Sequence, residues 1–347
     1  MSRRVLVLAV SGFLTVLLAA AAALLPVPYV ALQPGPTTNT LGTVGGKELI
    51  RISGHRTYPD NGHLDLVTVS VLGGPRQKLD LVTAVSGWLD DTVAVVPEST
   101  IYPKNESAKE AEQQSAAEMS DSQENATTAA LRQLGVPVTT KVLVDSLSPT
   151  SPSMGLLKAG DEIVTVDGKP VTGGASLRAA VTAHKAGQVA LLVVRRGGKD
   201  VSASVTTVSA PEDDRAIIGI TTRDMATYPF TVEISLQDVG GPSAGLMFAL
   251  GIVDKLTSGS LTGGRYVAGT GTIDDVGKVG AIGGIPQKMV GARRNGATVF
   301  LSPAENCGEA KANVPSGLRL VKVRSLADAL SSLKKLEAGR TSSLPRC

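Results

Sequence analysis

The chain has 347 residues, of which 42% are hydrophobic, so it is long enough for two or three domains with real cores. The formal net charge is only +3, the basic residues form no run, and 3% of the residues are aromatic. We expect no nucleic-acid partner, because neither a basic stripe nor a set of stacking rings is present.

The N-terminus predicts a membrane-spanning helix. After Arg3 and Arg4, residues 5–25 carry no charge, and a helix of that length crosses the hydrocarbon core of a bilayer. The two arginines predict a cytoplasmic N-terminus. We favour an anchor within residues 1–28 over a cleaved signal peptide, for which residues 19–23 offer small-residue cleavage sites. Both alternatives place the body of the protein outside the cytoplasm, and the anchor makes it a single-pass protein of the cell membrane.

Residues 29–135 predict a small β-rich membrane-proximal region followed by a helical linker. Residues 64–72, "LDLVTVSVL", alternate apolar and polar side chains as half-buried strands do. The polar stretch 105–124 and the segment after it predict one or two surface helices with a break near Ser120, and Gly135 is suited to a helix C′ position.

Residues 136–209 predict a β-sandwich with one helix. Apolar runs at residues 142–144, 163–166 and 189–194 predict strands, and the helix between the last two has apolar spacing at Leu177, Ala180, Val181 and His184. The stretch "GLLKAGDEIVTVDGKPV" resembles the turn, strand and hairpin of PDZ domains of the bacterial protease type. The resemblance implies binding of an extended peptide at a sheet edge, often by its C-terminus. The carboxylate-binding loop has no recognisable signature in the sequence, and we expect His184 to be partly exposed rather than part of the groove.

The stretch "GGPSAGLMFAL" raises the question of a nucleophilic serine. Pro242 fits the first position of a helix, which would place Ser243 in the first turn, where free N–H groups can hold an oxyanion. The alternative is an ordinary helix-opening turn without chemistry. Residues 241–245 match G-x-S-x-G, but no histidine follows Ser243, as the α/β-hydrolase order requires.

A lysine is then the expected base, provided that burial keeps its amine neutral. Lys288 stands out because it lies in a short helix, "GGIPQKMVGARRNG", at the edge of an apolar face formed by Ile285, Met289 and Ala292. A lysine there also feels the positive end of the helix dipole, which lowers its pKa. The alternative is a lysine whose stem lies on the apolar face while its head stays in water.

Residues 216–337, with "GGPSAG" and "GTGTIDDVGKVGAIGGIPQKMVGARRNGA", resemble the α+β proteolytic domain of Lon-type proteases. The resemblance implies that Ser243 is the nucleophile, Lys288 the general base and Thr270 the residue that orients the lysine. Gly241, Pro242 and Ala244 would form the nucleophile turn and the oxyanion region. One departure is Gly240, because ATP-dependent members commonly carry Asp at that place.

The remaining candidates for chemistry are few. Cys307 and Cys347 are too few for a disulfide framework, and the sequence leaves their pairing open. His55, His63 and His184 are scattered, and neither HExxH nor a Cys/His cluster occurs, so we expect no metal site and no cofactor. Residues 338–347 read as a C-terminal tail.

The whole order of anchor, PDZ domain and Lon-like domain, an α+β fold without a G-x-x-x-x-G-K-[ST] motif, resembles the YlbL-like family of membrane-anchored, PDZ-containing Lon-like proteases. This implies an ATP-independent serine endopeptidase with a Ser-Lys dyad that cleaves flexible extracytoplasmic proteins or peptides and binds them through the PDZ domain. The rival reading is an inactive membrane-tethered PDZ scaffold that binds peptide C-termini, and a weaker one is an esterase. Lon-like domains also suggest a homo-oligomer, which no interface pattern in the sequence tests.

Overall fold

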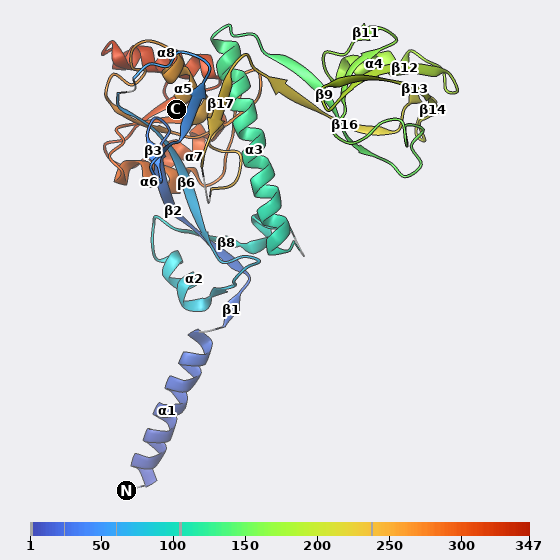
Figure 1. The fold of residues 1–347 in the computed structure, drawn as a ribbon. Helices are drawn as coiled ribbons and strands as arrows, with labels where there is room; N and C mark the ends of the chain where they lie inside the picture. Colours follow the sequence, from blue (N-terminus) through green and yellow to red (C-terminus); the bar gives the residue numbers. More distant parts are fainter. Residues whose placement is uncertain (1–2, 24, 60, 104–105, 237–238) are drawn as a thin grey trace. The chain divides into compact units, whose positions relative to one another are not determined.

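The computed structural model describes residues 3–23, 25–59, 61–103, 106–236 and 239–347 (Figure 1). These residues form two compact units, one of which interrupts the other in the sequence. Unit 1 combines Met1–Gly135 with Phe230–Cys347, and unit 2 is Val136–Pro229.

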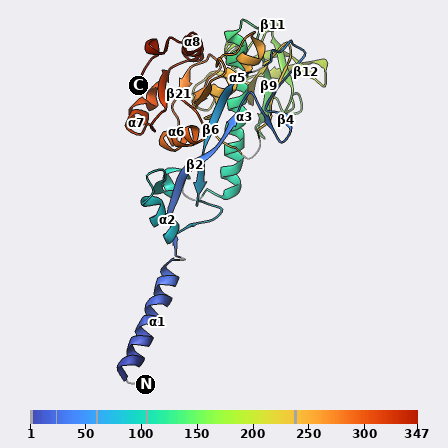
Figure 2. The ribbon, with the colours of Figure 1, turned by 90° about the vertical axis from the view of Figure 1, so that its left-hand side faces the viewer.

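Unit 1 is built on a mixed sheet with the strand order β22-β21-β18-β6-β2-β8. In that order the strands are Arg319–Val323, Val299–Pro303, Tyr266–Gly269, His63–Leu72, Tyr29–Asn39 and Ala94–Pro97. β18 pairs in parallel with both β21 and β6, whereas β2 pairs antiparallel with β6 and β8. Figure 2 shows β2, β6 and β21 in one sheet although they lie far apart in the sequence.

This shared sheet corrects the predicted boundaries. The β-rich stretch within residues 29–135 is not a separate membrane-proximal region, because β2 and β6 are central strands of the sheet that also contains β18 and β21. The half-buried pattern predicted for residues 64–72 is wrong in its first half, since Leu64 through Val67 are all buried. Val67 packs with helix α6 (Ile285–Arg294), and α5 (Gly245–Leu256) also contacts β6, so both faces of the strand are covered.

Helix α3 spans Ala108–Gln133 without a break, so the break predicted near Ser120 is wrong. Ser107 caps its N-terminus in a capping box with Glu110. Gly135 follows its end with φ +71°, as expected for a C′ glycine. The second half of α3 is buried rather than on the surface, and it packs against α5.

The other elements of unit 1 are short. Four strand pairs are β1 (Pro26–Val27) with β7 (Leu79–Asp80), β3 (Thr43–Val44) with β4 (Lys47–Glu48), β5 (Ile50–Ser53) with β17 (Thr231–Ile234), and β19 (Thr272–Ile273) with β20 (Val279–Gly280). The further helices are α1 (Arg3–Ala23), α2 (Leu81–Trp88), α7 (Cys307–Ala312) and α8 (Leu326–Glu337), with 3-10 turns at Glu98–Thr100, Ala304–Asn306 and Thr341–Ser343. By length and composition, α1 is the one described helix that could cross a membrane, and a signal sequence would pass the same test.

Unit 2 is an antiparallel sheet with the order β13-β12-β10-β9-β16, and one helix, α4 (Gly174–Thr182). The strands are β9 (Thr139–Leu147), β10 (Glu162–Val166), β11 (Lys169–Pro170), β12 (Val189–Arg196), β13 (Lys199–Thr206), β14 (Val208–Ser209), β15 (Ala216–Ile217) and β16 (Ile220–Thr227). The three strands expected from the apolar runs are present as β9, β10 and β12.

Two expectations for unit 2 need correction. Residues 216–229 were assigned to the Lon-like domain, but β16 pairs along β9 and closes the sheet of unit 2. Helix α4 ends at Thr182, so His184 lies just beyond it, where its Nε2 is 3.0 Å from Asp167 Oδ2.

Candidate active site

The turn that carries Ser243 precedes helix α5 rather than opening it. Helix α5 begins at Gly245, so the expectation that Pro242 is its first residue is wrong. The Ser243 carbonyl accepts hydrogen bonds from the Gly271 N–H at 2.9 Å and from the Thr270 hydroxyl at 3.0 Å. Because these donors occupy the carbonyl, the helical hydrogen-bond pattern starts only at the next residue.

Helix α3 holds the same turn from the other side. The Ser115 carbonyl accepts from the Gly241 N–H at 3.1 Å, and the Ser122 hydroxyl donates to the Pro242 carbonyl at 3.0 Å. A Cβ atom on Gly240 would lie 1.9 Å from Ser115 Oγ. The close approach of α3 explains why a glycine stands at position 240.

Lys288 reaches the turn from helix α6, which follows Gly284 in a left-handed conformation (φ +68°). Its Nζ lies 2.7 Å from Ser243 Oγ and 3.1 Å from Thr270 Oγ1. Only 3% of Lys288 and 1% of Thr270 is exposed. Burial lowers the pKa of Lys288 from 10.5 to about 7, because the charged ammonium loses its hydration. The lysine therefore lies inside the protein, beyond the edge position that the helical pattern indicated.

The residues at and after Ser243 have free backbone donors. The N–H groups of Ser243, Ala244 and Gly245 have no hydrogen-bond acceptor among the described residues, whereas the Leu246 N–H donates to the Gly271 carbonyl at 3.1 Å. Such a series of unpaired N–H groups at the start of a helix suits an anionic oxygen.

A cleft of about 1040 Å³ leads to this turn. It extends from the end of β6, at Val71 and Leu72, along α3 to Val239 and Gly240, close before Ser243 in the sequence.

The three histidines make other contacts. His63 stacks on Tyr266 with ring centroids 3.5 Å apart, and its Nδ1 lies 3.5 Å from Asp65 Oδ1. His55 packs against Phe230. Within the residues that the structure describes, no group of three or more His, Cys, Asp or Glu side chains is arranged to hold a metal ion.

Two features of unit 1 were not predicted from the sequence. Cys307 and Cys347, whose pairing the sequence left open, form a disulfide that ties the chain's last residue to the start of α7. The support that α3 gives to the nucleophile turn was also missed. Its signal is a stripe of small residues at helical spacing, Ser115, Ser122, Ala126 and Ala130, which lets another segment approach the helix closely.

The fold and the site define a two-part protein, in which a small antiparallel sheet with one helix interrupts an α+β domain with a buried lysine beside a serine. Comparison with known families matches two separate stretches of the chain. Residues 116–207 match the PDZ domain family, and residues 237–334 match the Lon protease (S16) C-terminal proteolytic domain. The chain therefore carries a PDZ domain and a Lon-type proteolytic domain. The first match begins inside α3, which the structure assigns to unit 1.

The similar curated proteins each match between 19% and 29% of this chain. The Lon protease of Heliobacterium modesticaldum is 40% identical over 89 residues, which are 25% of this chain and 11% of that protein. Lon protease 1 of Bacillus subtilis is 41% identical over 66 residues, 19% of this chain and 8% of that protein. The chain thus spans about a tenth of the length of the curated relatives it matches. Among solved structures, the PDZ domain of an SdrC-like protein from Listeria monocytogenes is 25% identical, with a TM-score of 0.23, and the match covers 23% of this chain and 85% of that one.

Proposed function

We propose that the chain is a serine endopeptidase in which Ser243 and Lys288 form the catalytic dyad. The observation that carries the proposal is the distance of 2.7 Å between Lys288 Nζ and Ser243 Oγ, together with a lysine pKa of about 7. At neutral pH a large share of the lysine is then a free amine that can accept a proton. The Lon-type family of the domain agrees with this chemistry.

The dyad performs acyl transfer in two steps. Neutral Lys288 takes the hydroxyl proton as Ser243 Oγ attacks the peptide carbonyl carbon, and the N–H groups of Ala244 and Gly245 stabilise the oxyanion. The C–N bond breaks as Lys288 returns the proton to the leaving amine, which leaves an ester on Ser243. Water then attacks the ester while Lys288 takes its proton, and the carboxylate product leaves with the serine hydroxyl restored.

Thr270 acts as a positioning residue in this scheme. Its hydroxyl donates to the Ser243 carbonyl, so its oxygen presents a lone pair to the Lys288 amine 3.1 Å away. The lysine therefore has two fixed oxygen neighbours, which restrict the orientation of its long side chain.

The test uses the purified full chain and an unstructured protein such as casein, without nucleotide. Ser243→Ala and Lys288→Ala should each abolish cleavage, whereas the exposed controls Ser258→Ala and Lys311→Ala should keep full rates. Adding ATP should leave the rate unchanged, since we propose cleavage without nucleotide. Full activity in either dyad variant would remove the proposed mechanism.

Two alternatives give different results in the same preparation. A catalytically inactive PDZ scaffold would show no labelling of Ser243 by a fluorophosphonate. An esterase would hydrolyse activated esters but leave casein and matched peptide amides intact.

We further propose that α1 anchors the chain in the cell membrane, with unit 2 and the part of unit 1 that follows the anchor on the extracytoplasmic side. The disulfide between Cys307 and Cys347 supports an oxidising compartment. Alkaline carbonate extraction should leave the full chain in the membrane fraction, and added protease should digest it in intact spheroplasts. Release of a shortened soluble chain would show a cleaved signal peptide instead.

A further inference from the structure

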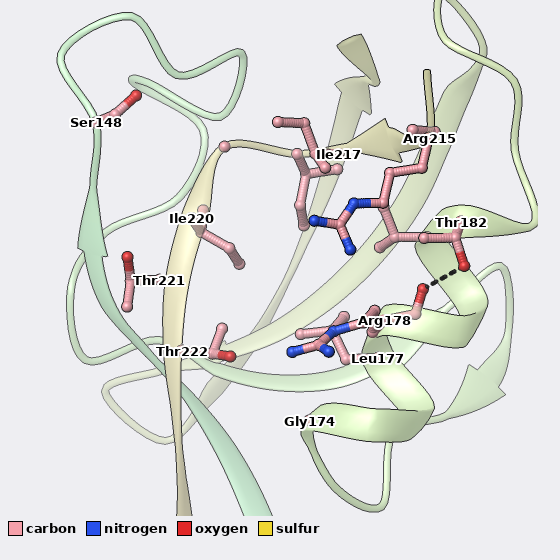
Figure 3. Close-up of a pocket in the computed structure, with 14 residues that line it drawn as sticks. Ser148, Gly174, Leu177, Arg178, Thr182, Arg215, Ile217, Ile220, Thr221 and Thr222 are labelled. Carbon is pink, nitrogen blue, oxygen red and sulfur yellow. Dashed lines mark hydrogen bonds between the residues drawn. The ribbon is translucent and has the colours of Figure 1, made fainter. Parts of the chain in front are cut away.

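Peptide binding, which the PDZ domain implies, accounts for the pocket of about 500 Å³ beside helix α4 in unit 2 (Figure 3). It does not account for an apolar surface on helix α2 of unit 1. Helix α2 exposes Val82, Val85 and Trp88, and Leu89 follows at its C-cap. Their exposed fractions are 53%, 42%, 54% and 83%, in that order. We call these four residues the apolar face of α2.

The apolar face is one continuous stripe. Because successive residues of a helix are turned by about 100°, its four side chains lie within an arc of about 120°. The opposite side of α2 packs on the sheet, where Ala84 and Gly87 are buried and a Cβ atom on Gly87 would lie 2.7 Å from Val95 Cγ2. Helix α2 contains no charged residue. An exposed, uncharged stripe of this kind marks an interaction surface.

The start of α2 is tied to the end of the proposed anchor. The Leu81 N–H donates to the Leu25 carbonyl at 3.1 Å, and β1 pairs with β7 directly before α2. Ala23, which ends α1, stands two residues before Leu25, so their Cα atoms are at most about 7 Å apart. A helix of 21 residues is about 32 Å long and fills the hydrocarbon core of a bilayer. When α1 spans the membrane, the start of α2 therefore lies at the level of the lipid headgroups.

The composition of the apolar face suits this depth. Trp is enriched at membrane–water interfaces, because its indole combines an apolar body with a polar N–H. The ring of Trp88 contacts Tyr29, with the ring centroids 5.6 Å apart, and more than half of the residue stays exposed. Asp90 and Asp91 follow the apolar face and are exposed. The attraction to a bilayer must therefore come from apolar contact rather than from anionic headgroups.

We propose that α2 lies in the lipid interface beside the anchor, with its apolar face buried at the boundary between headgroups and acyl chains. The partner of this face is the lipid surface, and the contact fixes the orientation of the folded part of unit 1 on the membrane. The proposal rests on the membrane anchoring proposed above. Leu79, Asp80 and Thr83 line the cleft of about 1040 Å³ that leads to the Ser243 turn, so the contact holds this part of the cleft beside the membrane surface.

Fluorescence quenching of Trp88, the chain's one tryptophan, tests the contact directly. The full chain is reconstituted in vesicles of equal parts phosphatidylcholine and phosphatidylglycerol. The phosphatidylcholine is either plain or brominated near the headgroup end of its acyl chains. We expect the brominated lipid to lower the emission of Trp88 about twofold, because interfacial helices bury their apolar face about 5–10 Å into this boundary.

A tryptophan at another exposed site gives the reference for water access. Val276 is 74% exposed and lies between β19 and β20, in a turn whose Gly277 carbonyl accepts from the Leu326 N–H of α8. Figures 1 and 2 show α8 and α2 at opposite ends of unit 1. In the chain with Trp88→Phe and Val276→Trp, we expect no quenching by brominated lipid. Soluble acrylamide should quench that chain about threefold more than it quenches the parent, whose indole the lipid covers.

Two pairs of substitutions assign the effect to α2. Val85→Asp with Leu89→Asp should abolish quenching of Trp88 by bromine and increase quenching by acrylamide, since carboxylates resist transfer into an apolar layer. The control pair is Val276→Asp with Val314→Asp. Its two positions are 74% and 41% exposed, against 83% and 42% for Leu89 and Val85, and it should leave both Trp88 signals unchanged.

Flotation of the vesicles separates this proposal from the anchor on which it rests. Trp88 emission that brominated lipid leaves unchanged, in a chain that floats with the vesicles, would overturn the α2 contact while the anchor stands. Protection from acrylamide without quenching by bromine would show that a protein covers the face instead, and would overturn the contact as well. A chain that does not float with the vesicles would overturn the anchor and the contact together. Because cleavage is not measured, loss of the Ser-Lys mechanism would leave these results unaffected.

Discussion

Replacing Lys288 by Met should abolish cleavage and at the same time stabilise the folded chain at neutral pH. Met has a side chain of similar length to that of Lys, and its apolar, flexible side chain packs well in an apolar site. Lowering the lysine pKa from 10.5 to about 7 means that the folded state disfavours the ammonium by about 5 kcal/mol. The variant also loses the hydrogen bonds of Lys288 with Ser243 and Thr270, and each loss lowers the free energy of unfolding by about 1 kcal/mol. These losses offset part of the gain. We therefore expect the variant to be about 2 to 3 kcal/mol more stable at pH 6.

The gain must depend on pH with a definite sign. Below pH 7 the lysine is protonated in both the folded and the unfolded chain. The buried charge then lowers the free energy of unfolding by its full amount. Between pH 7 and 10.5 the folded chain releases the proton and the unfolded chain keeps it, so the parent becomes more stable as pH rises. The advantage of Lys288→Met should shrink by about 3 kcal/mol between pH 6 and pH 9.

Urea unfolding followed by the fluorescence of Trp88 measures this difference. Trp88 is the chain's one tryptophan and lies in α2 of unit 1, where its ring contacts Tyr29. Titrations of both chains at pH 6, 7.5 and 9 give the free energies of unfolding. A difference that stays constant over this range would show that the amine does not titrate near neutrality and would refute the reasoning.

Four further predictions concern activity and stability. In the parent, kcat/KM should rise about tenfold from pH 6 to pH 8 and level off above, as Lys288 loses its proton through a pKa of about 7. Thr270→Val should lower kcat at least tenfold with little change in KM, because it removes the oxygen 3.1 Å from the amine. Gly240→Ala should lower kcat/KM for casein more than tenfold, since its Cβ would collide with α3. Reducing the Cys307–Cys347 disulfide, which separates residues 40 apart, should lower the free energy of unfolding by about 4 kcal/mol.

Each of these has a control. Any residual cleavage rate of Lys288→Met should not change between pH 6 and pH 8. A parent rate that is equally constant over this range would argue against an amine base. A pH profile in Thr270→Val that matches the parent in both midpoint and height would show that the hydroxyl has no positioning role. Gly308→Ala, at a glycine with open space around it, should leave kcat/KM unchanged. Stability that is unchanged by dithiothreitol would contradict the disulfide prediction.

The candidate residues of the site could be predicted from the sequence because each of them lies within a short motif of neighbouring residues. The serine turn, the threonine strand end and the lysine helix each carry a short pattern of glycines and apolar residues, and the structure brings Ser243, Thr270 and Lys288 within hydrogen-bond distance. The α+β fold class and the PDZ and Lon-type domains are confirmed, whereas the roles of the site residues stay predictions.

The long-range arrangement could not be predicted. Strand β6 pairs with β18 and so joins residues 63–66 to residues 266–269. The apolar and polar pattern of a strand does not identify the strand with which it pairs. The polar composition of α3 suggests a surface helix because only Met119 and Leu131 among its buried residues are large and apolar, and the others are Ser, Thr or Ala. Strand β16 was assigned to the wrong unit since a strand's periodicity does not identify the sheet it joins.

Because unit 2 interrupts unit 1 in the sequence, unit 1 cannot complete its folding early in synthesis. Strands β2 and β6 leave the ribosome early, yet β18 and β21, which complete their sheet, follow only after the whole of unit 2. Helix α3 is also synthesised before the turn around Ser243 that it supports. A nascent chain therefore cannot assemble the turn that carries Ser243 until the last third of the chain has been synthesised and has packed against the first third.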